Sequence, residues 1–150
     1  MPQKISFTLD GKKVEADKGL TIWEIAYGKG IKIPHLCHKP TPAYRPDGNC
    51  RACMVEIEGE RTLAASCIRE PTEGMVVSTN TDRAKSSRKM VVEMLLSDQP
   101  DSSISHDRSS HFWDMAEQNE ITESRLPKIE KDRVPLLDDS HLAMRVNLDA

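Results

Sequence analysis

Residues 33–67, IPHLCHKPTPAYRPDGNCRACMVEIEGERTLAASC, contain all four cysteines of this 150-residue chain. They follow the pattern C-x12-C-x2-C-x13-C and are Cys37, Cys50, Cys53 and Cys67. Four thiolates with one tight C-x2-C pair are the ligand set that a 2Fe–2S cluster requires, two sulfurs for each iron. Gly48 permits a tight loop with inward N–H groups, and Arg51 adds a positive charge beside the ligands. The stretch therefore predicts a metal centre, and its spacing favours iron–sulfur.

Two other uses of the four cysteines remain open at this point. Structural zinc sites usually carry two short C-x2-4-C pairs, and only one such pair is present here. Disulfides require an oxidising compartment, whereas the opening MPQKISFTLDG lacks the charged and then apolar regions of a secretion signal. We therefore expect reduced cysteines and a cytoplasmic protein.

Composition limits the class of protein. Hydrophobic residues make up 37% and charged residues 30%, and the net charge is −3 with scattered basic residues, so no basic face suggests nucleic acid. No apolar run approaches the ~18 residues of a membrane span. The length fits about one domain with an appendage. With two Trp, two Tyr and two Phe, the core is expected to rest on Ile, Leu, Val and Met, helped by a bound cluster.

The sequence before the cysteines predicts a hairpin and a helix. Residues 4–9 alternate between apolar and polar, and Asp10-Gly11 offers a type I′ turn into a second strand through Val14. Thr21 and Glu24 form a capping box that opens a helix of about two turns. Four prolines then exclude regular structure from the segment that follows.

The sequence after the cysteine loop predicts strands at 54–57, 63–65 and 75–78. The order β-β-α-(Cys loop)-β-β-β is typical of a small sheet that grasps one helix. A second helix is expected from Asn80 or Thr81 to Ser97, a loop over 98–110 and a short helix over 111–118. The second helix has an apolar face of Ala84, Ser87, Val91, Met94 and Leu95, and a basic face, expected to be solvated, of Arg83, Lys85, Arg88 and Lys89.

The motifs around the cysteines resemble a known family. Three motifs are similar to the N-terminal 2Fe–2S domain of an oxidoreductase superfamily: I-P-H before Cys37, the GNCRAC loop, and the hairpin before Cys67. Its members include the large iron–sulfur subunit of respiratory complex I, diaphorase subunits of NAD-linked hydrogenases, iron-only hydrogenases and NAD-dependent formate dehydrogenases. The resemblance implies an α+β, plant-ferredoxin-like β-grasp fold in which all four cysteines ligate the cluster. The long Cys37–Cys50 spacing departs from the C-x4-C opening of soluble plant-type ferredoxins and favours a domain of a larger enzyme.

The next segment departs from most of that superfamily. Complex I and hydrogenase relatives place a His-Pro and three cysteines there, and these hold a 4Fe–4S cluster. Here Gln99 stands at the histidine position, Ser102 and Ser103 replace the first cysteine, and His106 and His111 are expected to be surface residues. With the motifs YRPDGNCRAC, DQP and SHFWDMAE, this loss most resembles the alpha subunit of cytoplasmic, molybdenum-containing, NAD-dependent formate dehydrogenases.

That resemblance implies a domain organisation. Residues 1–79 would form the 2Fe–2S domain, 80–118 a helical segment without the usual 4Fe–4S ligands, and 119–150 an extended linker. The ending SHLAMRVNLDA is similar to the segment that precedes a two-cluster ferredoxin-like domain in those subunits, so we expect a fragment of a longer chain. The complete enzyme would contain molybdopterin, further 4Fe–4S clusters, and FMN and NAD in a partner diaphorase subunit.

The expected function is one-electron transfer as part of an NAD-dependent formate dehydrogenase. Plant-type centres lie near roughly −400 mV, low enough to work between formate and NAD. No Gly-rich phosphate loop and no catalytic Cys or selenocysteine motif occurs, so no catalytic residue, and no site for molybdopterin, flavin or NAD, is expected within the chain. Two alternatives remain: an electron-transfer subunit of a complex I-like or hydrogenase–diaphorase complex, and a zinc-stabilised interaction module without a redox role.

Overall fold

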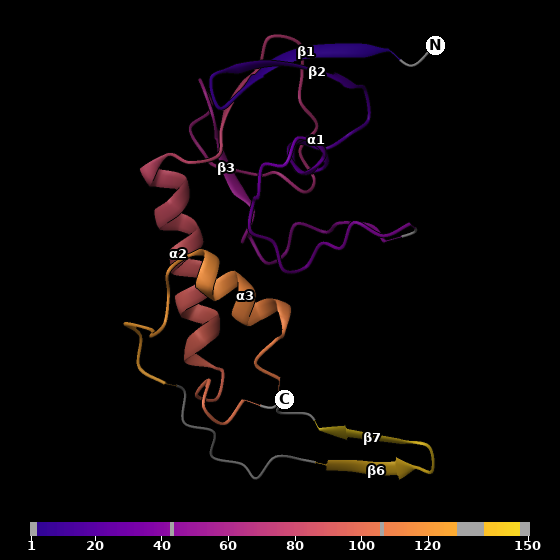
Figure 1. Cartoon of the computed structure of the whole chain (residues 1–150), viewed down its shortest axis with the longest axis vertical. Coiled ribbons are helices and arrows are strands. Elements are labelled where there is room, and N and C mark those ends of the chain that lie inside the picture. Colours follow the sequence, from indigo (N-terminus) through magenta and orange to yellow (C-terminus); the bar gives the residue numbers. More distant parts are fainter. Residues whose placement is uncertain (1–2, 43, 106, 129–136, 148–150) are drawn as a thin grey trace.

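A five-stranded mixed sheet forms the N-terminal part of the molecule (Figure 1). The computed structural model describes residues 3–42, 44–105, 107–128 and 137–147. The sheet order is β2-β1-β5-β3-β4, with β1 parallel to β5 and every other neighbouring pair antiparallel. The strands are β1 (Lys4–Leu9), β2 (Lys12–Asp17), β3 (Met54–Ile57), β4 (Ala64–Ala65) and β5 (Val76–Ser78). This arrangement, with one helix packed on the sheet, confirms the predicted α+β, β-grasp class.

Local sequence signals account for the first elements. Asp10 and Gly11 have φ values of 48° and 78°, as a type I′ turn requires, and they join β1 to β2. Helix α1 (Ile22–Gly28) begins with the predicted capping box. The Glu24 N–H donates to the Thr21 hydroxyl at 3.2 Å, and the Thr21 N–H donates to the Glu24 carboxylate at 2.8 Å.

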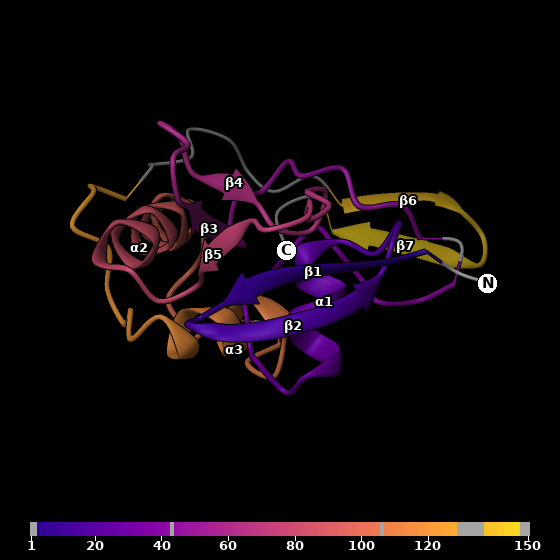
Figure 2. The ribbon, with the colours of Figure 1, turned by 90° about the horizontal axis from the view of Figure 1, so that it is seen from above.

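Helix α1 lies against one face of the sheet, below β1 and β2 in Figure 1 and behind them in the view from above of Figure 2. Its residues Ile22, Trp23, Ile25 and Ala26 are buried in a core that also contains Phe7, Leu9, Val55, Val77, Cys53 and Cys67. The largest fully buried side chains are Trp23 and Phe7, so the expectation of a core built on aliphatic residues and Met is incomplete. Cys53 and Cys67 therefore belong to the hydrophobic core of the sheet.

Helix α2 (Asp82–Ser97) buries most of its predicted apolar face, because Ala84 is buried and Val91 and Leu95 pack against a core, but two of its residues differ from the prediction. Ala84, Arg88, Val92 and Leu96 are buried at four-residue intervals, while Met94 is 57% exposed. The sequence prediction placed Met94 on the apolar face and Arg88 on the solvated face, and both placements are wrong. The reason is tertiary: Arg88 is buried because backbone carbonyls at the end of the sheet accept its hydrogen bonds.

A second, smaller core joins α2, the short helix α3 (His111–Gln118) and the cysteine loop. Met115 and Ala116 of α3 are buried against Val92 of α2 and Ala52, which lies between Cys50 and Cys53. Phe112, Trp113, Leu36 and Cys50 pack around this group. The short helix expected over 111–118 is confirmed, and the helical segment covers one side of the cysteine loop.

The part after α3 contains a two-stranded hairpin, β6 (Leu137–His141) and β7 (Met144–Asn147), that the sequence did not predict. Leu142, Met144 and Val146 of this hairpin are exposed. The predicted linker also includes residues 129–136 and 148–150, which lie outside the described residues, as does His106. Within the described parts of the chain, no helix has the length and apolar character needed to cross a bilayer.

An ion pair fastens the segment after α3 to α2. The Arg125 Nε and Nη2 groups each donate to the Glu93 carboxylate at 2.7 Å, and the Ser124 hydroxyl donates to the Glu93 carbonyl at 2.8 Å. The hydrogen bonds from Arg125 lower the pKa of Glu93 below its ordinary value of 4.5. A carboxyl group whose pKa is lower in the folded than in the unfolded protein stabilises the fold at pH values above its unfolded-state pKa. This stabilisation is lost as the pH falls through the pKa of the folded state.

We therefore expect a pH-dependent effect of Glu93→Gln. At pH 7 the variant should unfold at a lower urea concentration than the wild type, because the bidentate ion pair is lost. The difference should shrink as pH falls below 4.5 and disappear once Glu93 is protonated in the wild type. Urea titrations monitored by circular dichroism between pH 7 and pH 3 measure it. The control Glu120→Gln removes the exposed pair with Lys89 and should have little effect; a Glu93→Gln difference that grew on acidification would contradict the argument.

Candidate metal centre

The four cysteines come from two structural contexts. Cys53 directly precedes β3 and Cys67 follows β4, and these residues are only 1% and 0% exposed. Cys37 and Cys50 belong to the irregular loop and are half-buried. All four are free thiols in the structure. The sheet therefore holds one pair rigidly in its core, while the loop brings the second pair to the surface side.

Backbone N–H groups point at the sulfur of Cys50. The N–H groups of Cys37 and Ala52 donate to Cys50 Sγ at 3.5 and 3.4 Å. The turn that orients the Ala52 N–H has positive φ at Gly48 (65°) and Arg51 (60°). A Cβ on Gly48 would lie 2.7 Å from Ile68 Cδ1, so the loop also passes close to the end of the sheet. The predicted inward donors and the need for Gly48 are both found.

Cys53 and Cys67 form the other thiol pair. The Cys67 thiol donates a hydrogen bond to the Cys53 sulfur, and chiefly for that reason the pKa of Cys53 is lowered to about 6. The pKa of Cys67 is correspondingly raised, first by this bond and then by burial. The N–H group of Cys67, and the hydroxyl and N–H groups of Ser66, further lower the pKa of Cys53. A buried sulfur that several donors stabilise as a thiolate is a suitable metal ligand.

The two pairs lie close enough to act on one another. The negative charges of Cys53, Cys37 and Cys50 all raise the pKa of Cys67. Burial raises the pKa of Cys50, and the N–H groups of Ala52 and Cys37 oppose that effect. Within the described residues, no group of three or more His, Cys, Asp or Glu side chains has the arrangement of a single-ion site. The thiols are instead arranged as two neighbouring pairs.

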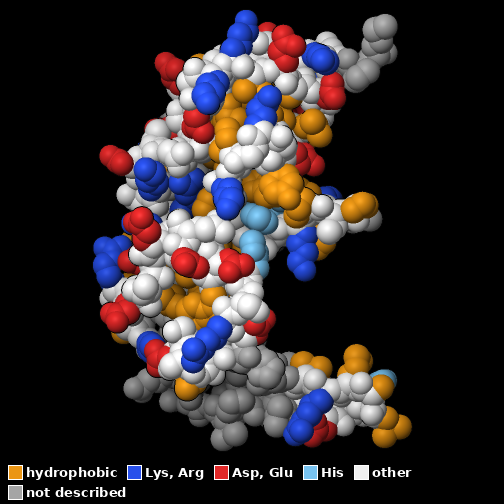
Figure 3. Space-filling model, viewed as in Figure 1, with side chains coloured by type: hydrophobic (Ala, Val, Ile, Leu, Met, Phe, Trp, Pro, Cys, Tyr) orange, Lys and Arg blue, Asp and Glu red, His pale blue; other side chains and the backbone are white. Residues whose placement is uncertain are grey.

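Aromatic rings cover the loop beside Cys37. The Trp23 ring lies 4.6 Å from the rings of His35 and His38, and its Nε1 donates to the Ile33 carbonyl at 3.1 Å. Burial lowers the pKa of both His35 and His38, which favours their neutral forms. Among the described residues, neither ring nitrogen of the buried His38 has a hydrogen-bond partner. Histidine side chains form a patch in the hollow at the middle of Figure 3.

His111 connects α3 to this loop. Its Nε2 lies 2.6 Å from the His35 carbonyl oxygen, and the rings of His35 and His111 are 4.5 Å apart. His111 is exposed, as expected, but it has a structural partner that the sequence did not indicate. The first residue of α3 therefore contacts the loop that contains Cys37.

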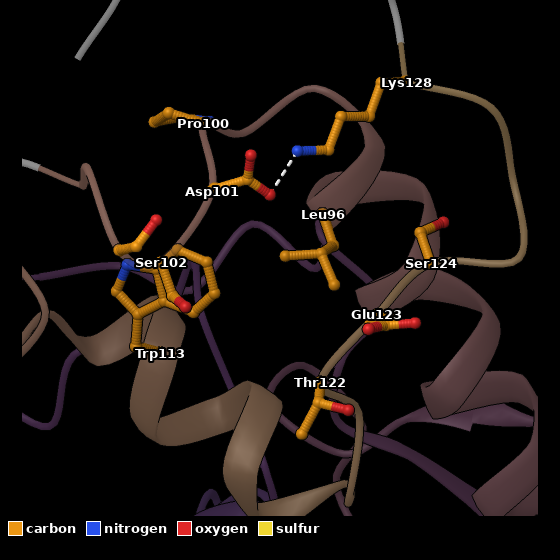
Figure 4. A pocket seen from close by; sticks show the side chains of 10 residues that line it. Leu96, Pro100, Asp101, Ser102, Trp113, Thr122, Glu123, Ser124 and Lys128 are labelled. Atoms are coloured by element: carbon orange, nitrogen blue, oxygen red, sulfur yellow. Dashed lines mark hydrogen bonds and ion pairs between the residues drawn. The ribbon is translucent and has the colours of Figure 1, made fainter.

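The segment that would carry second-cluster ligands in the resembled superfamily lines a pocket of about 370 Å³ (Figure 4). Ser102 and Ser103 line it together with Trp113, and an ion pair between Asp101 and Lys128 lies at its edge. The Trp113 indole N–H donates to the Ser105 hydroxyl at 2.9 Å. None of the four cysteines lines this pocket, so it is separate from the thiol site.

Two features of the site were missed by sequence reasoning. The I-P-H-L-C-H motif could have signalled the two histidines beside Cys37, but no pattern indicated that they pack on Trp23. The burial of Arg88 near Cys53 has no sequence signal at all. Arg83 and Lys85 are basic residues of the same helix and look alike in the sequence, yet both are exposed.

Comparison with known proteins gives a family match and several relatives. The family model for a 2Fe–2S iron–sulfur cluster binding domain matches residues 2–82. The NADP-reducing hydrogenase subunit HndD of Solidesulfovibrio fructosivorans is 41% identical over 99 residues, 64% of this chain and 17% of that protein. The mitochondrial 78 kDa subunit of NADH–ubiquinone oxidoreductase from Candida albicans is 39% identical over 97 residues, 65% of this chain and 13% of that protein.

The chain thus spans less than a fifth of the length of these two curated relatives, both of which are oxidoreductase subunits. A solved structure of an NAD+-reducing NiFe hydrogenase in the H2-reduced state contains a similar chain, with a TM-score of 0.78 and 28% identity. The match covers 92% of this chain and 57% of that one. The likeness in sequence is therefore accompanied by a likeness in fold that extends over most of the chain.

Proposed function

We propose, from the premise that this chain belongs to the 2Fe–2S iron–sulfur cluster binding domain family, that its four cysteines hold one 2Fe–2S cluster that transfers single electrons. The observation that carries this proposal is the arrangement of the thiols as two neighbouring pairs with N–H donors aimed at sulfur. The loop pair, Cys37 and Cys50, would bind one iron, and the core pair, Cys53 and Cys67, the other. When bound, such a centre accepts and releases one electron at a time.

The residues of the chain supply what an anionic cluster needs. The N–H groups of Cys37 and Ala52 donate to sulfur, and such bonds stabilise negative charge on the ligands. Phe7, Val55 and the rest of the sheet core exclude water around Cys53 and Cys67. Cys37 and Cys50 are closer to solvent, so the loop side is the side from which a donor or acceptor can approach.

Anaerobic reconstitution of the chain tests this proposal. We expect two irons and two acid-labile sulfides for each chain, an absorption spectrum typical of iron–sulfur, and an EPR signal after reduction with dithionite. Stoichiometric zinc without acid-labile sulfide would overturn the proposal and favour the zinc-stabilised interaction module. A Cys37→Ser/Cys50→Ser variant, which keeps the core pair, is the matched control and should retain no cluster.

The complete protein, on our proposal, is an NAD-dependent formate dehydrogenase of the cytoplasmic molybdenum type. Support comes from the motifs YRPDGNCRAC and SHFWDMAE and from Gln99, Ser102 and Ser103 at the positions of the second-cluster ligands. The longer subunit would then bind molybdopterin and 4Fe–4S clusters, and a diaphorase partner would bind FMN and NAD. On the same reasoning, residues 1–79 form the cluster domain, 80–118 its helical cover and 119–150 the connection to the rest of the subunit.

A second candidate is an electron-transfer subunit of a complex I-like or hydrogenase complex. The identities of 41% and 39% to subunits of those enzymes favour it. Anaerobic isolation of the complex from its host, with analysis of molybdenum and nickel, separates the two. Molybdenum with formate-dependent NAD reduction supports the first candidate. Nickel, H2-dependent NAD(P) reduction or quinone-linked NADH oxidation, each without molybdenum, supports the second.

A further inference from the structure

Arg88 is a buried cation in the middle of α2. It is 5% exposed, whereas Arg83 on the same helix has a side chain that is 47% exposed. Burying a guanidinium is costly, and such a group normally stays charged because its pKa is so high. A positive charge retained inside a protein this small therefore calls for a physical explanation.

The contacts of Arg88 lead to the core thiol pair. Its Nη1 donates to the Thr79 carbonyl at 2.8 Å and to the Met54 carbonyl at 3.3 Å, and Met54 is the residue after Cys53. Nε is buried and has no hydrogen-bond partner among the described residues. These bonds go to neutral carbonyls, so the hydrogen-bond partners described for Arg88 do not neutralise its charge. Attraction to Cys53 and Asp10 opposes the lowering of its pKa by burial.

The charge affects reduction more strongly than an exposed charge would. Adding an electron to a metal–thiolate centre makes the centre more negative, and net charge near such a centre shifts its potential. Charges interact more strongly where water is excluded, whereas solvent screens a side chain such as Arg83. A cation fixed beside Cys53 therefore stabilises the reduced form more than the oxidised form.

We propose that Arg88 is a positioning residue whose buried charge raises the reduction potential of the centre held by Cys37, Cys50, Cys53 and Cys67. This proposal rests on the proposed function. Arg88 ties α2 to the peptide that follows Cys53, which fixes the distance between the charge and the sulfur. The helical segment then tunes the electron carrier as well as covering its loop.

The test compares midpoint potentials of the reconstituted full chain by EPR-monitored redox titration. Iron and sulfide are measured first in the wild-type chain. Failure of that chain to bind a cluster overturns the proposed function, whereas a loaded cluster with an unchanged potential in the variant overturns only the role of Arg88. Arg88→Gln should lower the equilibrium constant for reduction about tenfold, or about 59 mV for a one-electron couple. Arg83→Gln removes the same charge from the exposed face of α2 and should change the equilibrium constant for reduction less than about twofold.

Two further variants separate charge from packing. Arg88→Lys keeps the charge and should stay close to the wild-type potential; a fall as large as that of Arg88→Gln would overturn the proposal. A purely structural role predicts a different sign, because a loosened site admits water, which favours the more charged reduced form and raises the potential. An unchanged or raised potential in Arg88→Gln therefore also overturns the proposal.

Asp10→Asn covers the case in which Arg88→Gln does not load iron. Asp10 accepts hydrogen bonds from the Thr79 N–H and hydroxyl at 2.7 Å each, and its charge acts on Arg88. Asn tolerates the φ of 48° at this turn. Removing this negative charge makes the net charge around Arg88 more positive, so the midpoint potential of the centre should rise. If it does not rise, charge at this position does not act on the centre, and the proposal is overturned.

Discussion

Replacing Cys53 by serine is expected to abolish cluster binding and to loosen residues 35–67. Cys53 is 1% exposed and shares a hydrogen bond with Cys67, so its loss removes half of the core pair. The loop over residues 35–49 has three prolines and few apolar anchors, and metal binding contributes directly to the order of such a segment. Iron and sulfide should fall to background, and amide exchange in 35–67 should accelerate at least about tenfold relative to the loaded wild type.

The hairpin of β1 and β2 and helix α1 should keep most of their protection in this variant, because their core contacts do not depend on the loop. Ser97→Ala is the control. It removes the hydrogen bond from the buried Ser97 hydroxyl to the Met94 carbonyl at 2.7 Å and leaves every thiol and its hydrogen-bond donors in place. It should bind iron normally. Equal exchange protection of residues 35–67 with and without the cluster would contradict the argument.

Trp23→Ala should destabilise the fold by about 3–5 kcal/mol, the range for removing a large buried aromatic side chain. Trp23 is 2% exposed and joins α1 to the cysteine loop through the rings of His35 and His38 and the Ile33 carbonyl. Urea unfolding of the cluster-free protein, followed by circular dichroism, measures the change without contribution from metal.

Tyr27→Ala is the control for Trp23→Ala. Tyr27 lies one turn further along α1 and stacks on Trp23 at 5.0 Å, but it is 61% exposed. Its removal should cost less than about 1 kcal/mol. If the two variants were equally stable, Trp23 would not be the main contact between helix α1 and the cysteine loop. The stabilising contacts between them would then have to come from the histidines.

The features that could be predicted from sequence are those specified by neighbouring residues. The turn at Asp10-Gly11 and the capping box of Thr21 and Glu24 follow from backbone preferences and short-range hydrogen bonds. The thiol site could be predicted because metal ligation restricts residue type and spacing. Assignment of the four cysteines as ligands remains a prediction that reconstitution will test.

The features that could not be predicted depend on contacts between distant segments. Arg88 is buried because the carbonyls of Met54 and Thr79 accept its hydrogen bonds, and no residue near Arg88 in the sequence indicates those partners. Strand β6 (LDDSH) is polar at four of its five positions, and β7 (MRVN) alternates over four residues only, which is too short a pattern to identify a strand. Both cases are tertiary effects that override local propensity.

The parallel pairing of β1 with β5 has a consequence for the rate of folding. Thr8 pairs with Val76 and Leu9 with Val77, so this pairing closes a loop that contains all four cysteines. Contacts between residues far apart in sequence slow folding, because chain entropy is lost before the contacts form. A cluster that linked Cys37 to Cys67 would shorten the loop, but each halving of loop length lowers the closure cost by only about 0.6 kcal/mol. The speed at which the sheet forms is therefore a property of its topology and depends little on the availability of iron.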